Sequence, residues 1–228
     1  MVRHAALPLS ILATLVLAAC SPAEKKTEAP AASGATPAAA GNKKVAITAI
    51  VEHPALDAVR KGVLDELKAQ GFEEGKNLTV DFQSAQGSTA NAAQIAKKFA
   101  GDNPDVIVAI ATPSAQSVVA ATKTIPVVYS AVTDPVAAKL VSSWEPSGTN
   151  VTGVSDELPL EPQIDLMKKI VPTVKNIGYV YSPGEVNSTT VLEQLKTKLG
   201  GQGLNVVAAP AQRSSDVLTA ARSLQGKV

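Results

Sequence analysis

Residues 105–132 read DVIVAIATPSAQSVVAATKTIPVVYSAV, and this stretch decides the fold class. Its two ends, 105–111 and 125–132, are rich in Val and Ile and have the length of strands buried on both faces. The small residues between them, 114–122, have the length of a helix. Because a strand, a crossover helix and a second strand form a right-handed parallel unit, the stretch predicts a parallel sheet covered by helices.

The same alternation continues on both sides of this unit. We expect further strands at 44–51, 77–83, 150–154, 176–181 and 204–208, and further helices at 55–70, 88–100, 161–170, 188–199 and 215–224. The pattern predicts an α/β protein with two doubly wound parallel-sheet lobes, at 43–146 and 147–228, joined by a crossover at 143–150. Fewer strand–helix units follow the crossover than precede it, so we expect the second lobe to be incomplete.

The N-terminal residues resemble a secretory signal peptide that ends in a bacterial lipobox. Arg3 and His4 precede an apolar run at 7–19, which is too short to span a bilayer as a mature helix. The run closes with LAAC, whose last residue, Cys20, is the single cysteine of the chain. In a lipobox this cysteine is lipidated before cleavage. The alternative is an ordinary signal peptide with an incidental cysteine.

We therefore predict a lipoprotein signal peptide over 1–20, a lipid anchor on Cys20, and a flexible Ala- and Pro-rich tether over 21–42. Acyl chains stabilise membrane attachment by burying their CH₂ groups in the bilayer. The predicted localisation is extracytoplasmic, lipid-anchored to a bacterial membrane at the periplasmic face or the cell surface.

Charge and composition exclude two kinds of interaction. The 21 basic and 20 acidic residues leave a net charge of +1, without the basic excess of a nucleic-acid-binding chain, so we predict no nucleic-acid partner. A single cysteine excludes a disulfide within the chain. Stability must come from an ordinary apolar core, and a hydrophobic content of 45% is enough to build one.

Catalytic and cofactor motifs are missing from the sequence. No G-x-G-x-x-G follows the first strand, and there is no G-x-x-x-x-G-K-[ST], G-x-S-x-G or H-E-x-x-H motif. His4 lies in the predicted signal peptide, and His53 alone cannot hold a metal ion. We therefore predict a binding protein and not an enzyme, with no cofactor and no metal.

In open parallel sheets, ligands bind in the crevice outside the carboxyl ends of the strands. The loops there are rich in hydroxyl, Asp and Asn side chains and lead into helix N-termini, which are ready anion sites. We predict that the ligand-binding residues are His53, Thr112, Ser114, Ser130, Asp134, Asp156, Asn187 and Ser188. The alternative roles are a turn before Pro54 for His53, a loop position for Asp156, and helix capping for Thr112, Ser114, Asp134, Asn187 and Ser188.

These loops also carry a resemblance to a known family. Five motifs stand in order: EHPALD at 52–57, ATPSAQ at 111–116, SAVTDP at 130–135, TGVSD at 152–156 and YSPGEVNS at 181–188. Together they resemble the ABC-transporter substrate-binding lipoproteins whose characterised relatives bind tryptophan, phenylalanine or tyrosine. The resemblance runs from about residue 43 to the end. It implies a type I periplasmic-binding-protein fold with an amino-acid-like ligand in the interlobe cleft. In that family the chain continues through more of the second lobe and crosses back to the first.

We therefore predict an extracytoplasmic solute-binding lipoprotein of an ABC importer, with an ABC permease as its partner and a small, aromatic or branched amino acid as its ligand. For such a zwitterion, the helix near Ser114 and the hydroxyl of Thr112 would take the carboxylate. Asp156 is our first choice for the ammonium group, before Asp134 and Glu185. The alternatives are a ligand-sensing ectodomain of the same fold and a surface α/β hydrolase.

Overall fold

The computed structural model describes residues 41–228. The predicted signal peptide over 1–20, the predicted lipidation site Cys20, and all but the last two residues of the predicted tether over 21–42 lie outside the described residues. No helix within 41–228 is both long enough and apolar enough to cross a bilayer.

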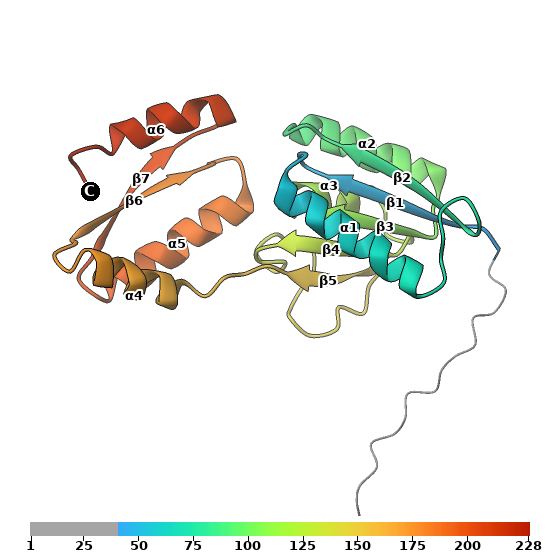
Figure 1. Cartoon of the computed structure of the whole chain (residues 1–228), viewed down its shortest axis with the longest axis horizontal. Helices are drawn as coiled ribbons and strands as arrows, with labels where there is room; N and C mark the ends of the chain where they lie inside the picture. The colour runs from blue at the N-terminus through green and yellow to red at the C-terminus, as the bar shows by residue number, and fades with distance from the viewer. Residues whose placement is uncertain (1–40) are drawn as a thin grey trace, which may run out of the picture. The chain divides into compact units, whose positions relative to one another are not determined.

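The first sheet has five parallel strands in the order β2-β1-β3-β4-β5 (Figure 1). The strands are β1 (Lys43–Ala49), β2 (Leu78–Ser84), β3 (Val106–Ile110), β4 (Val127–Val132) and β5 (Val151–Ser155). The helices that follow the first three strands are α1 (Pro54–Ala69), α2 (Thr89–Asp102) and α3 (Thr112–Ala121). The strand–helix alternation predicted around residues 105–132 is therefore the alternation that the chain adopts.

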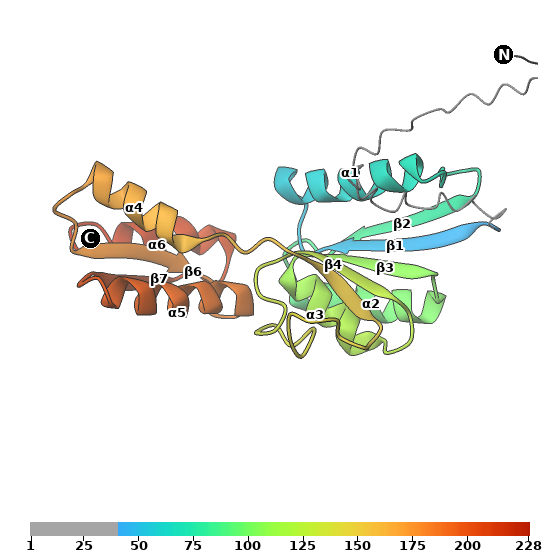
Figure 2. The same cartoon turned by 90° about the horizontal axis from the view of Figure 1, so that it is seen from below.

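Helices cover both faces of this sheet, with α1 on one side and α2 and α3 on the other (Figure 2). Side chains alternate along β1, so Val45, Ile47 and Ala49 pack in the cluster under α1, while Ala46 packs in the cluster under α2 and α3. The second cluster contains the largest fully buried side chain of the described residues, Phe99. The core therefore lies on both faces of the central strands, as in other doubly wound sheets.

The structure corrects the predicted position of the fifth strand. We placed 150–154 in the second lobe, but β5 pairs with β4, with Val127 opposite Val151 and Tyr129 opposite Gly153. Residues 143–150 therefore connect two strands of one sheet, and the predicted crossover between sheets at this segment is wrong. The predicted boundary after residue 146 does not separate the two sheets. A parallel neighbour needs a long return connection, and the segment after β4 is that connection.

The second sheet contains two parallel strands, β6 (Asn176–Tyr181) and β7 (Asn205–Pro210). One of its faces packs against α4 (Leu160–Ile170) and α5 (Val186–Gly200), through Ile164, Ile177 and Leu195. The other face packs against α6 (Val217–Ser223), which follows a 3₁₀ turn, η1 (Ser214–Asp216). Two parallel sheets, each with helices on both faces, confirm the predicted α/β class with a smaller second lobe.

Candidate ligand-binding site

Strained backbone gathers where the strands of the first sheet end. Of the five non-glycine residues with positive φ in the described chain, Gln86 follows β2, Ala111 follows β3 and Ala131 lies near the end of β4. Their φ angles are 53°, 75° and 53°. Side chains other than glycine adopt these conformations at a cost, and such residues cluster at ligand sites. The carboxyl edge of the first sheet therefore has the strained backbone that is typical of ligand sites.

The first turn of α3 lies at this edge and has no side-chain cap. The helix begins at Thr112, and its N-cap is Ala111, at φ 75° and ψ 152°. We predicted that the helix begins at Ser114, which is wrong, and the alternative role of Thr112 and Ser114 as helix caps is wrong as well. The sharp turn at Ala111 lets the helix start two residues earlier, so both side chains lie inside the first turn. The N–H groups of this turn remain available to an anion.

Two buried hydroxyl groups near this edge have no hydrogen-bond partner among residues 41–228. Ser114 is 0% exposed and its Oγ is unpartnered. Thr48, one residue before the end of β1, is 1% exposed and its Oγ1 is also unpartnered. An unsatisfied buried hydroxyl costs about 1–3 kcal/mol, so each of the two lowers the stability of the ligand-free fold. A polar ligand that hydrogen-bonds to Ser114 would remove this cost at the α3 N-terminus.

Ser130 and Asp134 lie on or just after β4. Ser130 is half-buried, and its carbonyl oxygen accepts a hydrogen bond from the N–H of Ala111 at 2.9 Å, which fixes the turn before α3. Asp134 Oδ1 accepts hydrogen bonds from the N–H groups of Val136 and Ala137, both at 2.9 Å. Capping by Asp134, the alternative role, is therefore confirmed, and the backbone that it caps is a turn over residues 135–139.

His53 and Asp156 are exposed and lie after β1 and β5. His53 is the N-cap of α1, because its Nδ1 accepts a hydrogen bond from the N–H of Ala55 at 3.2 Å. This contact matches the alternative role, a turn before Pro54. The backbone N–H of Asp156 donates to the carbonyl oxygen of Val132 at 3.2 Å, while its carboxylate makes no hydrogen bond or ion pair within the described residues. Its charge therefore remains available to a ligand.

Asn187 and Ser188 lie in the first turn of α5, at the carboxyl end of β6. Ser188 Oγ accepts a hydrogen bond from the N–H of Ser182 at 2.9 Å. Burial raises the pKa of Tyr179, and its hydrogen bond with Ser188 opposes that rise. Ser188 therefore closes the loop after β6. Asn187 Oδ1 is buried and unpartnered, which leaves an acceptor for a ligand or a water molecule.

Arg213 is a candidate that our sequence reasoning missed. It follows β7, and the N–H of Ala211 donates to the carbonyl oxygen of Tyr181 at 2.8 Å, so the ends of β6 and β7 are adjacent. Arg213 is exposed, and its guanidinium forms none of the ion pairs found within residues 41–228. We call the rule that ligands bind outside the carboxyl ends of parallel strands the strand-end rule. Applied to the predicted strand at 204–208, this rule would have pointed to Arg213.

The strand-end loops are mostly acidic. Glu52, Asp134, Asp156, Glu157 and Glu185 lie within them, and Arg213 is their basic side chain. Lys139 is exposed and lies farther along, at the end of the turn that Asp134 caps. No three His, Cys, Asp or Glu side chains of the described residues are placed to hold a metal ion. The loops therefore suit a ligand that carries a positive charge beside any carboxylate.

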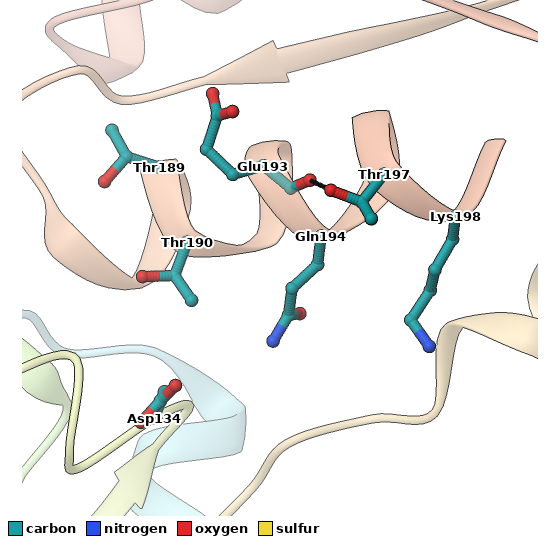
Figure 3. Close-up of a pocket in the computed structure, with 7 residues that line it drawn as sticks. All are labelled: Asp134, Thr189, Thr190, Glu193, Gln194, Thr197 and Lys198. Carbon is teal, nitrogen blue, oxygen red and sulfur yellow. Dashed lines mark hydrogen bonds between the residues drawn. The ribbon is translucent and has the colours of Figure 1, made fainter. Parts of the chain in front are cut away.

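One surface hollow of about 670 Å³ involves a predicted site residue, Asp134 (Figure 3). Its other lining residues all belong to α5 and are Thr189, Thr190, Glu193, Gln194, Thr197 and Lys198. Figure 3 shows Asp134 facing the Thr190 side of the helix. We did not predict these residues, because a polar helical stripe has the pattern of an ordinary solvated face. The other predicted ligand residues lie outside this hollow.

Comparison with known proteins agrees with the fold. The sequence model of the family described as ABC transporter substrate binding protein matches residues 44–228. The chain is 42% identical over 186 residues to a tyrosine-binding protein of Clostridioides difficile. The aligned residues make up 82% of this chain and 54% of that protein. The chain thus spans about half the length of this curated relative.

The solved structures that are similar to this chain include the following two. A conserved domain protein from Vibrio cholerae has 55% identity and a TM-score of 0.79, over 80% of this chain and 62% of that one. An ABC domain from Streptococcus pneumonia, solved in complex with L-Trp, has 36% identity and a TM-score of 0.78, over 82% of this chain and 63% of that one. The chain therefore belongs to the family of ABC transporter substrate-binding proteins and has the type I periplasmic-binding-protein fold.

Proposed function

We propose that this protein is an extracytoplasmic solute-binding lipoprotein of an ABC importer, and that its ligand is a zwitterionic amino acid with an aromatic or branched side chain. The observation that carries the proposal is the first turn of α3, where uncapped N–H groups adjoin the unpartnered, fully buried hydroxyl of Ser114. Family membership supports the binding role, and the tyrosine-binding relative and the relative solved with L-Trp support the ligand class.

The ligand's carboxylate binds at the α3 N-terminus in this proposal. The helix dipole favours negative charge there, and the N–H groups of the first turn point out of the helix. Ser114 and Thr112 add their hydroxyl groups, and both residues are buried, at 0% and 2% exposure. These N–H and hydroxyl groups are neutral donors, so they can bind a carboxylate without a cationic side chain. Asn187 and Arg213, at the edge of the second sheet, are the further candidates for this role.

The ligand's ammonium group binds a carboxylate near the same edge. Asp156 remains the first candidate, because its side chain is not engaged within the described residues. Asp134 is second, because its Oδ1 already caps the turn that follows β4. Glu185 is third, because its Oε2 accepts a long hydrogen bond of 3.4 Å from Asn187 Nδ2. A buried ammonium without such a partner would be costly, so one of these groups is required.

The proposal excludes an enzymatic role. A hydrolase needs a nucleophile within hydrogen-bond reach of a base. Ser114 Oγ has no hydrogen-bond partner among residues 41–228, and His53 uses its Nδ1 to cap α1. The partners that we propose are the amino acid, an ABC permease and a membrane reached through a lipid on Cys20, with no nucleic acid.

A thermal-shift screen of the full chain tests this function. The panel is amino acids, sugars and purines, because a ligand that binds only the native state raises its melting temperature. We expect a response to aromatic or branched amino acids, and none to their N-acetyl derivatives, which lack the ammonium group. A response to sugars or purines alone would refute the ligand class. Turnover of any responding compound would refute the binding-only role.

A further inference from the structure

We propose that His53 makes the start of α1 sensitive to protons and thereby makes ligand affinity depend on pH. The neutral imidazole caps the helix, whereas the protonated imidazole cannot. In acid the first turn of α1 loosens, and the neighbouring ligand site binds more weakly. The second step rests on the proposed function, while the first concerns the protein without ligand. Histidine is the side chain that ordinarily changes its charge between pH 5 and 8.

The cap depends on the lone pair of one ring nitrogen. His53 Nδ1 accepts a hydrogen bond from the N–H of Ala55 at 3.2 Å. Nδ1 accepts only while it has no proton, so the capping ring is neutral and holds its proton on Nε2. A protonated ring is a donor at both nitrogens, and it brings a positive charge to the positive end of the helix dipole. The cap therefore stabilises the helix start at higher pH and is lost as the pH falls through the titration of the ring.

Few other contacts hold the first turn of α1. Pro54, its first residue, has no N–H group, and the N–H of Asp57 donates to the carbonyl oxygen of His53 at 2.8 Å. No residue of α1 is fully buried, whereas α2 and α3 each bury several side chains. The turn is thus held by partial packing and by its cap, so loss of the cap weakens it.

The charged side chains nearest to His53 along α1 are already paired with each other. Arg60 Nη2 lies 3.2 Å from Asp57 Oδ1, and Arg60 Cζ lies 4.0 Å from the centre of the Phe82 ring on β2. A cation over an aromatic face is stabilised there, so Arg60 stays beside Asp57. The Asp57 carboxylate is therefore largely neutralised by Arg60 and gives little support to a second positive charge on His53.

The elements that pack beside α1 add little charge near His53. Neither residues 84–88 after β2 nor residues 111–116 around the start of α3 contain a charged side chain, and both lysines of β1 lie at its opposite, amino end. The charged groups on the other strands and in the loops that follow them are Asp81, which pairs with Lys98, Asp134, which caps a turn, and Asp156. Glu52 adjoins His53 in the chain and is exposed, so a protonated ring turns toward it and away from Ala55.

The first turn of α1 and the α3 N-terminus are connected through β4. Leu56, in that turn, packs against the same apolar cluster as Ala131. Ala131 has a φ of 53°, and its neighbour Ser130 accepts the hydrogen bond from the N–H of Ala111 at 2.9 Å that fixes the turn before α3. When the first turn of α1 loosens, the strained end of β4 loses packing, and the proposed carboxylate site loses its fixed geometry. Ligand affinity therefore falls in acid.

NMR spectroscopy of the full chain without ligand tests the cap. In the parent, the Ala55 amide resonance should move between pH 7.5 and 5 with the same midpoint as the His53 ring resonances. His53→Asn is the matched control, because its Oδ1 accepts from the helix N–H groups at either pH, and it should abolish this movement. His53→Ala, which has no cap at any pH, should abolish it too. An Ala55 resonance that stays in place while His53 titrates, or that moves equally in His53→Asn, would overturn the proposal.

Calorimetric titration with L-tryptophan and L-tyrosine at pH 7.5 and 5 tests the effect on the ligand site. The parent should bind about fivefold more weakly at pH 5, the factor that corresponds to loss of one helix cap. His53→Asn should bind equally at both values, and since every other titrating group is shared, the ratio of affinities isolates His53. A parent ratio of one, or an equal ratio in His53→Asn, would refute the effect on affinity. If neither amino acid binds at either pH, the proposed function and this second step both fail, while the Ala55 resonance still decides the first.

Discussion

Ser114 combines complete burial with an unused hydroxyl group, and Ala111 combines a positive φ with a side chain that disfavours it. Both features cost free energy in the ligand-free fold. They adjoin the same helix N-terminus, which is the pattern expected where a fold gives up stability to keep a site ready for a ligand. Neither cost is visible in the sequence, because burial and φ depend on the assembled sheet.

Replacing Ala111 with glycine measures the strain before α3. Glycine adopts positive φ without steric conflict, so Ala111→Gly should raise the free energy of unfolding by about 1 kcal/mol. Ala120→Gly, at an exposed position inside the same helix, should lower it by about 1 kcal/mol. Urea unfolding of both variants gives the comparison. A loss of stability in both would mean that Ala111 is not strained.

Asp156→Asn tests the ammonium partner at constant side-chain shape. Loss of the charge should weaken binding of an amino acid by about tenfold to a hundredfold, the range for a hydrogen bond to a charged group. Asp165→Asn, at an exposed position on α4, is the matched control and should leave affinity unchanged. Calorimetric titration distinguishes the two. Equal affinity in Asp156→Asn and the parent would move the role to Asp134 or Glu185.

At the scale of elements, the period of the apolar residues predicted the strands and helices, but it did not predict which strands pair. The strand at 150–154 was predicted correctly, but its assignment to the second sheet was wrong. The sequence of a short strand does not indicate which strand it pairs with. The start of α3 was missed because Pro113 follows Thr112, and we placed the helix after the proline. In the structure Pro113 is inside the first turn, where proline needs no N–H partner.

Gly153 shows what fixes β5 beside β4. A Cβ added there would lie 2.2 Å from the carbonyl oxygen of Tyr129 and 2.4 Å from its Cγ, so only glycine allows this approach. Gly153→Ala should lower the free energy of unfolding by about 3 kcal/mol. Gly62→Ala in α1 meets no atom within 4 Å and should raise it by about 1 kcal/mol. Denaturant unfolding of both variants gives the measurement. If Gly153→Ala were as stable as the parent, the claim that only glycine fits beside Tyr129 would be wrong.

At the scale of the whole molecule, the predicted anchor decides where the protein works. Cys20→Ala should release the protein from membranes, because no acyl chain can then be attached at the lipobox position. Membrane fractionation of cells that express either form gives the measurement. If the variant sediments with membranes as the parent does, the anchor on Cys20 is wrong.

The candidate site was predicted in part from the strand-end rule. That rule places Thr112, Ser114, Asp134 and Asp156 at one sheet edge, and the structure has them in the first turn of α3 and in the loops after β4 and β5. Polar atoms of His53 and Ser188 accept hydrogen bonds from the local backbone, and the ligand role of both residues stays a prediction. Sequence alone cannot separate a side chain that stabilises a loop from one that remains free, because both types favour helix N-termini.

The central claim is that an amino-acid carboxylate binds at the first turn of α3, and calorimetric titration of the full chain tests it most directly. L-tryptophan and L-tyrosine should bind the parent, and Ser114→Ala should lose about 1.5–3 kcal/mol of binding free energy. The same variant should unfold no more easily than the parent, because it removes an unsatisfied buried hydroxyl. Ser117→Ala, whose hydroxyl donates to the carbonyl oxygen of Pro113 at 2.9 Å, should bind like the parent. Equal affinity in the parent and Ser114→Ala would contradict the claim.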